Sequence, residues 1–145
     1  MKFFLTLFFL LSVGMLLAQD EDYVSLEDRL KSNIFLKVEA SSTDCFVGEP
    51  IIVSYKLYSA MASESNIVRR PSFTGFDVKD LKAGPDDIAS RESIDGVRFD
   101  VHTVLKLQLT PVKDGTLSLG PLTMRNRVRL VNANGKKDAI LNGVT

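Results

Sequence analysis

Two side-chain types suited to nucleophilic or acid–base chemistry occur only once each in this sequence of 145 residues, as Cys45 and His102. Asp100 lies two residues before His102, so the two side chains would share one face of a strand. Hydrolysis by a catalytic triad also needs a nucleophile, donors for the oxyanion and a pocket, and the sequence offers no such set. One histidine and one cysteine also lack the ligand spacing of a zinc site. We therefore predict a protein that is not an enzyme, with no catalytic or metal-binding residue and with His102 at the surface.

Acidic pairs and glycines are the remaining features that could hold a calcium ion or a phosphate group. Asp86 and Asp87, and the acidic run at residues 20–22, lack the alternating oxygen ligands of a calcium-binding loop. The glycines Gly115 and Gly120 do not have phosphate-loop spacing, and they lie in strand-like sequence. We interpret the acidic residues as solvated and predict no cofactor-binding residue.

The charged residues are balanced, with 18 basic and 18 acidic side chains. This balance argues against a nucleic-acid-binding protein, which would normally show a basic patch. Arg125, Arg127 and Arg129 alternate, however, and would point the same way from one strand. This arginine stripe is either a solvated sheet face or a docking surface for an acidic partner. We take these arginines as candidate partner contacts, together with Phe73 and Phe76 of a loop bounded by proline and glycine.

Cys45 cannot form an internal disulfide, because it is the only cysteine in the chain. We interpret it as a buried, inert thiol beside Phe46, since free cysteines are commonly buried. An intermolecular disulfide or a reactive thiol is the alternative. In either case an apolar core must supply the stability of the domain.

The N-terminus has the features of a secretion signal. Lys2 precedes an almost wholly apolar run from Phe3 to Leu17, which is shorter than the roughly 20 apolar residues that a spanning helix needs. We predict a signal peptide over residues 1–18, cleaved after Ala18, and a periplasmic product without a membrane span. An uncleaved N-terminal anchor is the alternative. Lipoprotein processing is not expected, because no cysteine stands directly after the apolar run.

The mature chain begins with a charged leader, residues 19–32, for which we predict a short helix or a flexible segment. Leu26 and Leu30 are spaced for one helical face, and Ser25 followed by Asp28 is close to a capping box.

From residue 33 to residue 145 the pattern is that of an all-β domain. Asp95-Gly96 is a tight-hairpin signature between two β-like runs. Apolar residues then occupy nearly every second position from Val97 to Leu109, which predicts one long strand that buries a single face. About seven strand-like segments at short spacing indicate a sandwich or a barrel. We predict an immunoglobulin-like antiparallel β-sandwich, although the cysteine pair and the tryptophan of antibody domains are absent.

Three stretches of this domain resemble the BatD family of aerotolerance, or oxygen-tolerance, proteins. They read CFVGEPIIVSYKLYS from Cys45, RRPSFTGFDVKDL from Arg69, and IDGVRFDVHTVLKLQLTPVKDGTLSLGPL from Ile94. The resemblance covers about residues 33–131. It rests on four motifs in order, namely VGEP before a strand, P-S-F-x-G-F, I-x-G and P-x-x-x-G-x-L.

The resemblance implies an exported protein with tandem immunoglobulin-like domains that works beside membrane-bound von Willebrand A-type partners in oxygen or stress tolerance. It implies no catalytic residues. Members usually end in a membrane-spanning helix that anchors them in the inner membrane. This chain is much shorter, so we expect a truncated member or an N-terminal part, with its last sandwich strand missing or incomplete.

The leading hypothesis is therefore a non-enzymatic protein–protein interaction module of the cell envelope. The alternative is a generic exported β-sandwich that binds a ligand or acts like an adhesin domain. That alternative predicts exposed aromatic side chains gathered on one face, for which Tyr58 is a candidate. An exported hydrolase has no set of residues behind it.

Overall fold

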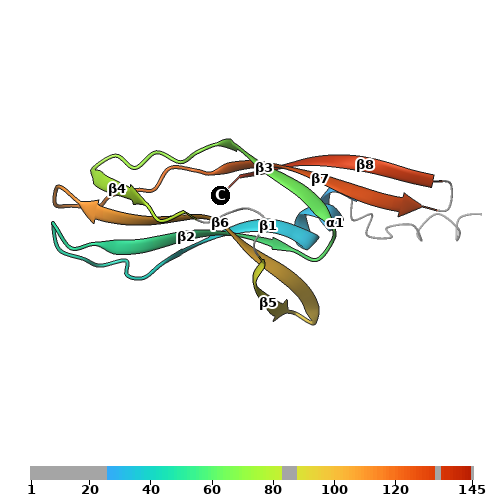
Figure 1. The fold of residues 1–145 in the computed structure, drawn as a ribbon, viewed down its shortest axis with the longest axis horizontal. Coiled ribbons are helices and arrows are strands. Elements are labelled where there is room, and N and C mark those ends of the chain that lie inside the picture. Colours follow the sequence, from blue (N-terminus) through green and yellow to red (C-terminus); the bar gives the residue numbers. More distant parts are fainter. Residues whose placement is uncertain (1–25, 83–87, 133–134, 145) are drawn as a thin grey trace, which may run out of the picture.

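The computed structural model describes residues 26–82, 88–132 and 135–144, and these form two antiparallel sheets that pack as a sandwich (Figure 1). The helix and strands are α1 (Leu26–Asn33), β1 (Ile34–Ala40), β2 (Ile51–Ser59), β3 (Ser63–Arg69), β4 (Phe76–Asp80), β5 (Ile88–Ile94), β6 (Val97–Pro111), β7 (Thr123–Asn132) and β8 (Gly135–Val144). The predicted signal peptide and its cleavage site after Ala18 lie outside the described residues, as do Asp86 and Asp87. Among the described residues, no helix combines the length and the apolar sequence that crossing a bilayer requires.

The order of the strands is that of an immunoglobulin domain. The first sheet has the order β1-β2-β6-β4, and the second has the order β3-β7-β8. Immunoglobulin constant-type domains place their first, second, fifth and fourth strands in one sheet and their third, sixth and seventh in the other. The seven strands here take these places in chain order once β5 is set aside. The predicted immunoglobulin-like sandwich is confirmed, and β5 is an addition that forms a hairpin with β6.

The last strand of the sandwich is present, which corrects the expectation that it would be missing or incomplete. β8 pairs with β7 along its whole length, from Asn132 opposite Gly135 to Thr123 opposite Val144. Its sequence, GKKDAILNGV, opens with a glycine and three charged residues. Alternation therefore does not reveal this strand, which is defined by its backbone pairing with β7.

The long strand β6 does not bury a single face, which corrects a second expectation. The register between β2 and β6 shifts at Tyr55 and Lys56, so that Leu105 lies opposite Tyr55 while Thr103 lies opposite Lys56. Val104 is the extra residue of a β-bulge, and a bulge inverts the alternation beyond it. Before the bulge Phe99 and Val101 face away from the second sheet, whereas Leu105 and the later leucines face it.

Two apolar clusters follow from this change of face. The main core lies between the sheets and contains Ile34, Ile51, Val53, Tyr55, Leu57, Val104, Leu105, Leu107, Leu109, Leu122 and Met124. A smaller outer cluster lies on the other face of the first sheet and contains Tyr58, Phe99 and Val101, with Phe35 and Ile94 packed against it.

The predicted leader contains the helix. α1 lies beside β1 and β8, and its Leu30 is buried. The carbonyl of Asn33 accepts a hydrogen bond of 2.8 Å from the Ala60 amide, which ties the end of α1 to the turn after β2.

Candidate functional site

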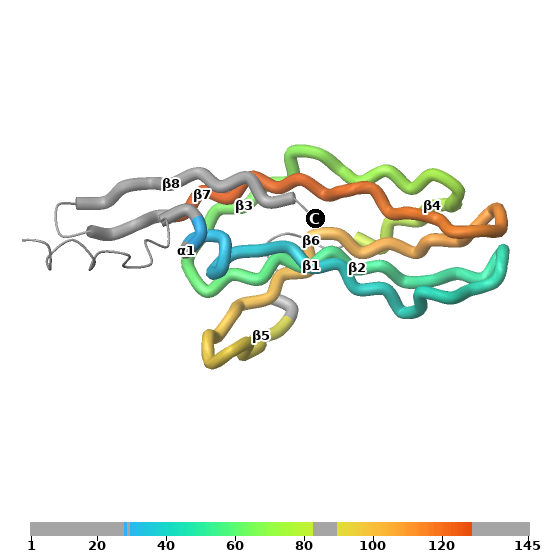
Figure 2. The backbone as a smooth tube through the Cα atoms, turned by 180° about the vertical axis from the view of Figure 1, so that it is seen from behind, coloured from blue at the N-terminus to red at the C-terminus, as the bar shows by residue number. Residues whose placement is uncertain are grey.

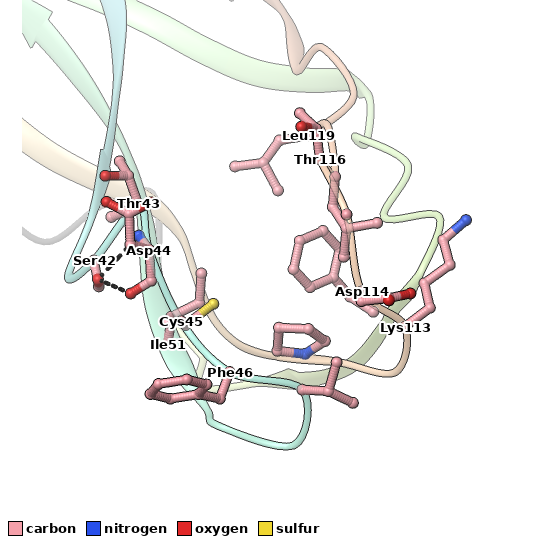
Figure 3. Close-up of a pocket in the computed structure, with 16 residues that line it drawn as sticks. Ser42, Thr43, Asp44, Cys45, Phe46, Ile51, Lys113, Asp114, Thr116 and Leu119 are labelled. Carbon is pink, nitrogen blue, oxygen red and sulfur yellow. Dashed lines mark hydrogen bonds between the residues drawn. The ribbon is translucent and has the colours of Figure 1, made fainter.

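A hollow of about 850 Å³ opens between two loops that are distant in the sequence (Figure 3). Both loops lie at the end of the sandwich farthest from α1 (Figure 2). The first wall is the β1–β2 connection and the second is the connection that leaves β6. Cys45, Phe76 and Leu119 line the hollow and also pack against the main core. The remaining lining residues are Ala40, Ser42, Thr43, Asp44, Phe46, Val47, Ile51, Pro111, Lys113, Asp114, Gly115, Thr116 and Leu117. The hollow is therefore a continuation of the core that is open to solvent.

The first wall is held by its own hydrogen bonds. Its tip is a turn in which the Glu49 amide donates to the Phe46 carbonyl, while the Phe46 amide donates to the Glu49 carboxylate over 2.9 Å. The Gly48 amide donates to the Pro111 carbonyl, so the tip is also tied to the end of β6. The φ of Gly48 is 86°, a conformation that glycine adopts without strain. The turn therefore fixes Phe46, whose surface is 83% exposed.

The second wall packs closely on the loop before β4. The Val112 amide donates to the Gly75 carbonyl, and the Gly120 amide donates to the Ser72 carbonyl. A Cβ atom at Gly120 would lie 2.6 Å from the Ser72 backbone nitrogen, a separation at which atoms must shift. Glycine at this position thus permits the close approach of the two segments.

Two of the predicted contact residues lie here, Phe73 in that loop and Phe76 as the first residue of β4. Both are half-buried against the main core, and the Phe76 amide donates to the Phe73 carbonyl over 3.1 Å. Phe76 lines the hollow, whereas Phe73 is not among the lining residues. Of this pair, only Phe76 is placed where a molecule in the hollow would touch it.

Two members of the arginine stripe, Arg125 and Arg127, lie on the outer face of the second sheet. Arg125 and Arg127 are exposed and alternate with the buried residues Met124 and Asn126 of β7. Arg127 forms an ion pair with Glu64 of β3 at 3.8 Å, and Arg129 lies in register with Asp138 of β8. The stripe therefore runs between strands that also carry acidic residues. Arg125 and Arg127 point away from the interior of the sandwich, so the structure does not join them to Phe76 in one surface.

His102 is half-buried, which corrects the prediction of a surface histidine. The bulge at Val104 places His102 opposite Leu57, on the side of the first sheet that faces the second. Its Nδ1 atom is buried and has no hydrogen-bond partner among the described residues. Asp100 does not orient the imidazole, because its carboxylate accepts a hydrogen bond of 2.9 Å from Arg91.

Tyr58 is fully buried, so it is not the exposed aromatic that a ligand-binding face would require. Its ring stacks on Phe35 with a centroid distance of 5.0 Å, and Phe99 meets the pair edge-on. The exposed aromatic is Phe46 instead, at the mouth of the hollow (Figure 3). Its position two residues before Gly48 and four before Pro50 was the available signal for it.

Cys45 lies on the first wall with its side chain directed into the hollow (Figure 3). It is a free, half-buried thiol. No group of three or more histidine, cysteine or acidic side chains in the described part of the chain is placed to hold a metal ion.

Comparison of the chain with models of known families, with curated proteins and with solved structures finds no match. The resemblance to BatD therefore rests on the quoted residues. The immunoglobulin-like arrangement rests on the strand order.

Proposed function

We propose that this protein is a non-enzymatic protein–protein interaction module of the cell envelope, of BatD type, that acts in oxygen or stress tolerance. The observation that carries the proposal is where the resembling motifs lie. Three of the four surround the hollow, at residues 47–50, at residues 71–76 and at residues 111–117. The fourth forms the β5–β6 turn, with Asp95 and Gly96 at positive φ.

The same end of the molecule exposes apolar side chains on a fixed backbone. Phe46, Val47 and Val112 are 83%, 56% and 61% exposed. A backbone hydrogen bond from Gly48 ties the turn that carries Phe46 and Val47 to Pro111, the residue before Val112. Aromatic side chains are enriched in protein interfaces. A fixed backbone also loses little conformational freedom when a partner binds. These residues favour a protein partner at this end.

The partner expected from the resemblance is a membrane-bound protein with a von Willebrand A-type domain. The predicted signal peptide would bring this protein to the periplasm, where such a partner is accessible. The arginine stripe is a second candidate contact, suited to an acidic surface on the same partner.

A second candidate function is a generic exported domain that binds a ligand or acts like an adhesin. The volume of the hollow favours it, because about 850 Å³ lies within the range of roughly 300–1,000 Å³ that is usual for small-molecule sites. The first function brings a protein partner to this end of the molecule, whereas the second places a small ligand in the hollow.

The proposed function is tested by capture from envelope extracts of the source organism, with mass spectrometry of the bound proteins. We expect the wild-type protein to retain a von Willebrand A-type protein and Phe46→Ser to lose it. Val97→Ser removes a 41% exposed apolar side chain from the β5–β6 hairpin and is the matched control. Equal recovery of the partner by Phe46→Ser, or its absence from the wild-type capture, would contradict the proposal.

A further inference from the structure

The second wall of the hollow contains a stretch of backbone without hydrogen-bonded neighbours. Residues 116–122 run into β7 without a turn or a bend. β8 pairs with β7 only as far as Thr123. No backbone hydrogen bond joins Thr116, Leu117, Ser118 or Leu119 to the rest of the described chain. These four residues, the open segment, therefore resemble an exposed sheet edge, where unpaired N–H and C=O groups can pair with another strand.

The side chains of the open segment alternate as those of a strand do. Leu117 and Leu119 are half-buried, whereas Thr116 and Ser118 are exposed. Leu119 packs against the main core, and Leu117 lies under the position that a Cβ of Gly75 would take. One face of the segment is therefore apolar and the other is polar.

Apolar side chains from both sides line the space beside the open segment. Cys45 and Leu119 point toward the space between the walls (Figure 3), and Ile51 and Phe76 also line it. The first wall bends at Thr43 and Asp44 and is not paired with the open segment. The hollow thus has an apolar interior and, along one side, a row of unpaired peptide groups.

We propose that the hollow receives an extended segment of another polypeptide, which adds to the second sheet as a strand beside residues 116–119. Its side chains would alternate, with apolar ones on Cys45 and Phe76 and polar ones toward solvent. Backbone hydrogen bonds would supply affinity and the apolar positions specificity. The inference rests on the proposed function in that the occupant belongs to a protein partner.

An extended segment suits the hollow better than a helix does. A helix pairs its own backbone groups internally and would leave the peptide groups of the open segment unpaired. A polar group that loses water without gaining a hydrogen-bond partner weakens the complex. An added strand removes that cost because its backbone groups complement those of the open segment. The position also continues the line of β8 along β7.

Disulfide trapping at the native Cys45 tests this geometry. The probe is a synthetic peptide of alternating valine and threonine with lysine at both ends, in which one cysteine is moved through successive positions as an activated mixed disulfide. Exchange joins the peptide to Cys45 and releases the activating thiol. We expect trapping at every second position and little between, because strand side chains alternate. Equal trapping at all positions, or none, would overturn the proposal. Cys45→Ser is the control for reaction elsewhere, since the chain has no other cysteine.

Fluorescence anisotropy with a labelled, cysteine-free peptide tests the backbone contribution. A version methylated at alternate amide nitrogens keeps every side chain but loses donors, and we expect it to bind about tenfold more weakly or worse. Cys45→Phe fills the hollow and should weaken binding similarly, while Cys45→Ser should not. Circular dichroism and thermal melting check that both variants are folded. Equal binding of the two peptides would refute the added strand.

The two proposals fail in different ways. A captured partner that the valine–threonine peptide does not displace would refute the added strand and leave the interaction function standing. Peptide trapping with a period of two, without capture of a von Willebrand A-type protein, would support the added strand and contradict the proposed partner.

Discussion

The Tyr58 hydroxyl donates a hydrogen bond to the Glu92 carboxylate over 3.1 Å, which joins β2 to β5 on the outer face of the first sheet. The ring is fully buried beneath Phe35 and Phe99. A phenolate at this position would lose water and would face the carboxylates of Glu92 and Glu39. Burial, with the hydrogen bond and charge of Glu92 next, raises the pKa of Tyr58 to about 12.

Alkaline pH should therefore destabilise the fold through Tyr58. Because its pKa is higher in the folded chain than the value of about 10 in the unfolded chain, the unfolded state releases the proton first. The stabilisation is complete below about pH 10 and is lost as the pH rises toward 12, by up to roughly 2–3 kcal/mol. Urea unfolding at several alkaline pH values measures the loss, and tyrosinate absorbance follows the titration. If Tyr58→Phe shows the same decline between these pH values, Tyr58 is not its source.

Gly120→Ala should weaken the junction between the second wall and the loop before β4. Its Cβ would lie 2.6 Å from the backbone nitrogen of Ser72, so the Gly120–Ser72 hydrogen bond must break or shift. We expect a loss of about 1–3 kcal/mol in the free energy of unfolding. The control is Ser118→Ala, which alters an exposed residue on the same segment. Equal stability of the two variants would show that the close approach does not matter.

Leu107→Ala should be among the more costly substitutions, because Leu107 is only 1% exposed within the main core. Truncation of a buried leucine costs about 2–5 kcal/mol, depending on how far the cavity collapses. The neighbouring Lys106 is exposed, and Lys106→Ala should change stability by no more than about 0.5 kcal/mol. The urea midpoints of the two variants compare the stability that each loses. Similar losses would mean that β6 pairs in another register, in which Leu107 does not face the core.

Charge reversal of the arginine stripe tests its role in binding. We expect the triple variant Arg125→Glu, Arg127→Glu and Arg129→Glu to lose partners in capture from an envelope extract, because the complementary charge is inverted. Arg98→Glu, at an exposed position of the β5–β6 hairpin, is a control for the general effect of an added acid. Unchanged recovery by the triple variant would mean that the stripe is only a solvated face.

Export should yield a mature protein that begins at Gln19. Mass spectrometry of the periplasmic product measures this terminus directly. Ala18→Arg places a large charged residue before the cleavage site, where a small residue is needed, and should cause the precursor to accumulate. A product that retains residues 1–18 in the wild-type protein would favour the uncleaved anchor.

Local patterns predicted much of the fold. Alternation identified β6, and the Asp95-Gly96 pair identified the turn before it, where both residues have positive φ. Alternation could not reveal the bulge, because Val104 is itself apolar and the pattern in the sequence continues past it. The sequence at residues 60–65 does not indicate a strand, yet β3 begins at Ser63. Backbone pairing with β7 defines this edge strand, and its sequence carries little apolar periodicity.

The candidate site was less predictable than the fold. The predictions included Phe76 but neither Cys45 nor Phe46, because the hollow depends on the approach of two loops about 70 residues apart. The burial of Tyr58 was equally hidden. It depends on contacts with Phe35, Phe99 and the β5–β6 hairpin on one face of the sheet. These contacts join distant parts of the chain, so local spacing in the sequence cannot predict them.

The bulge at Val104 makes β6 a strand of two clusters, with Phe99 in the outer one and Leu107 in the main core. A continuous strand transmits distortion along its length, so neither cluster is an independent folding unit. Because β6 belongs to both, the β5–β6 hairpin is continuous with the immunoglobulin framework. Its loss would remove Phe99 and Glu92 from Tyr58 and expose the outer face of the sheet whose inner face forms the core.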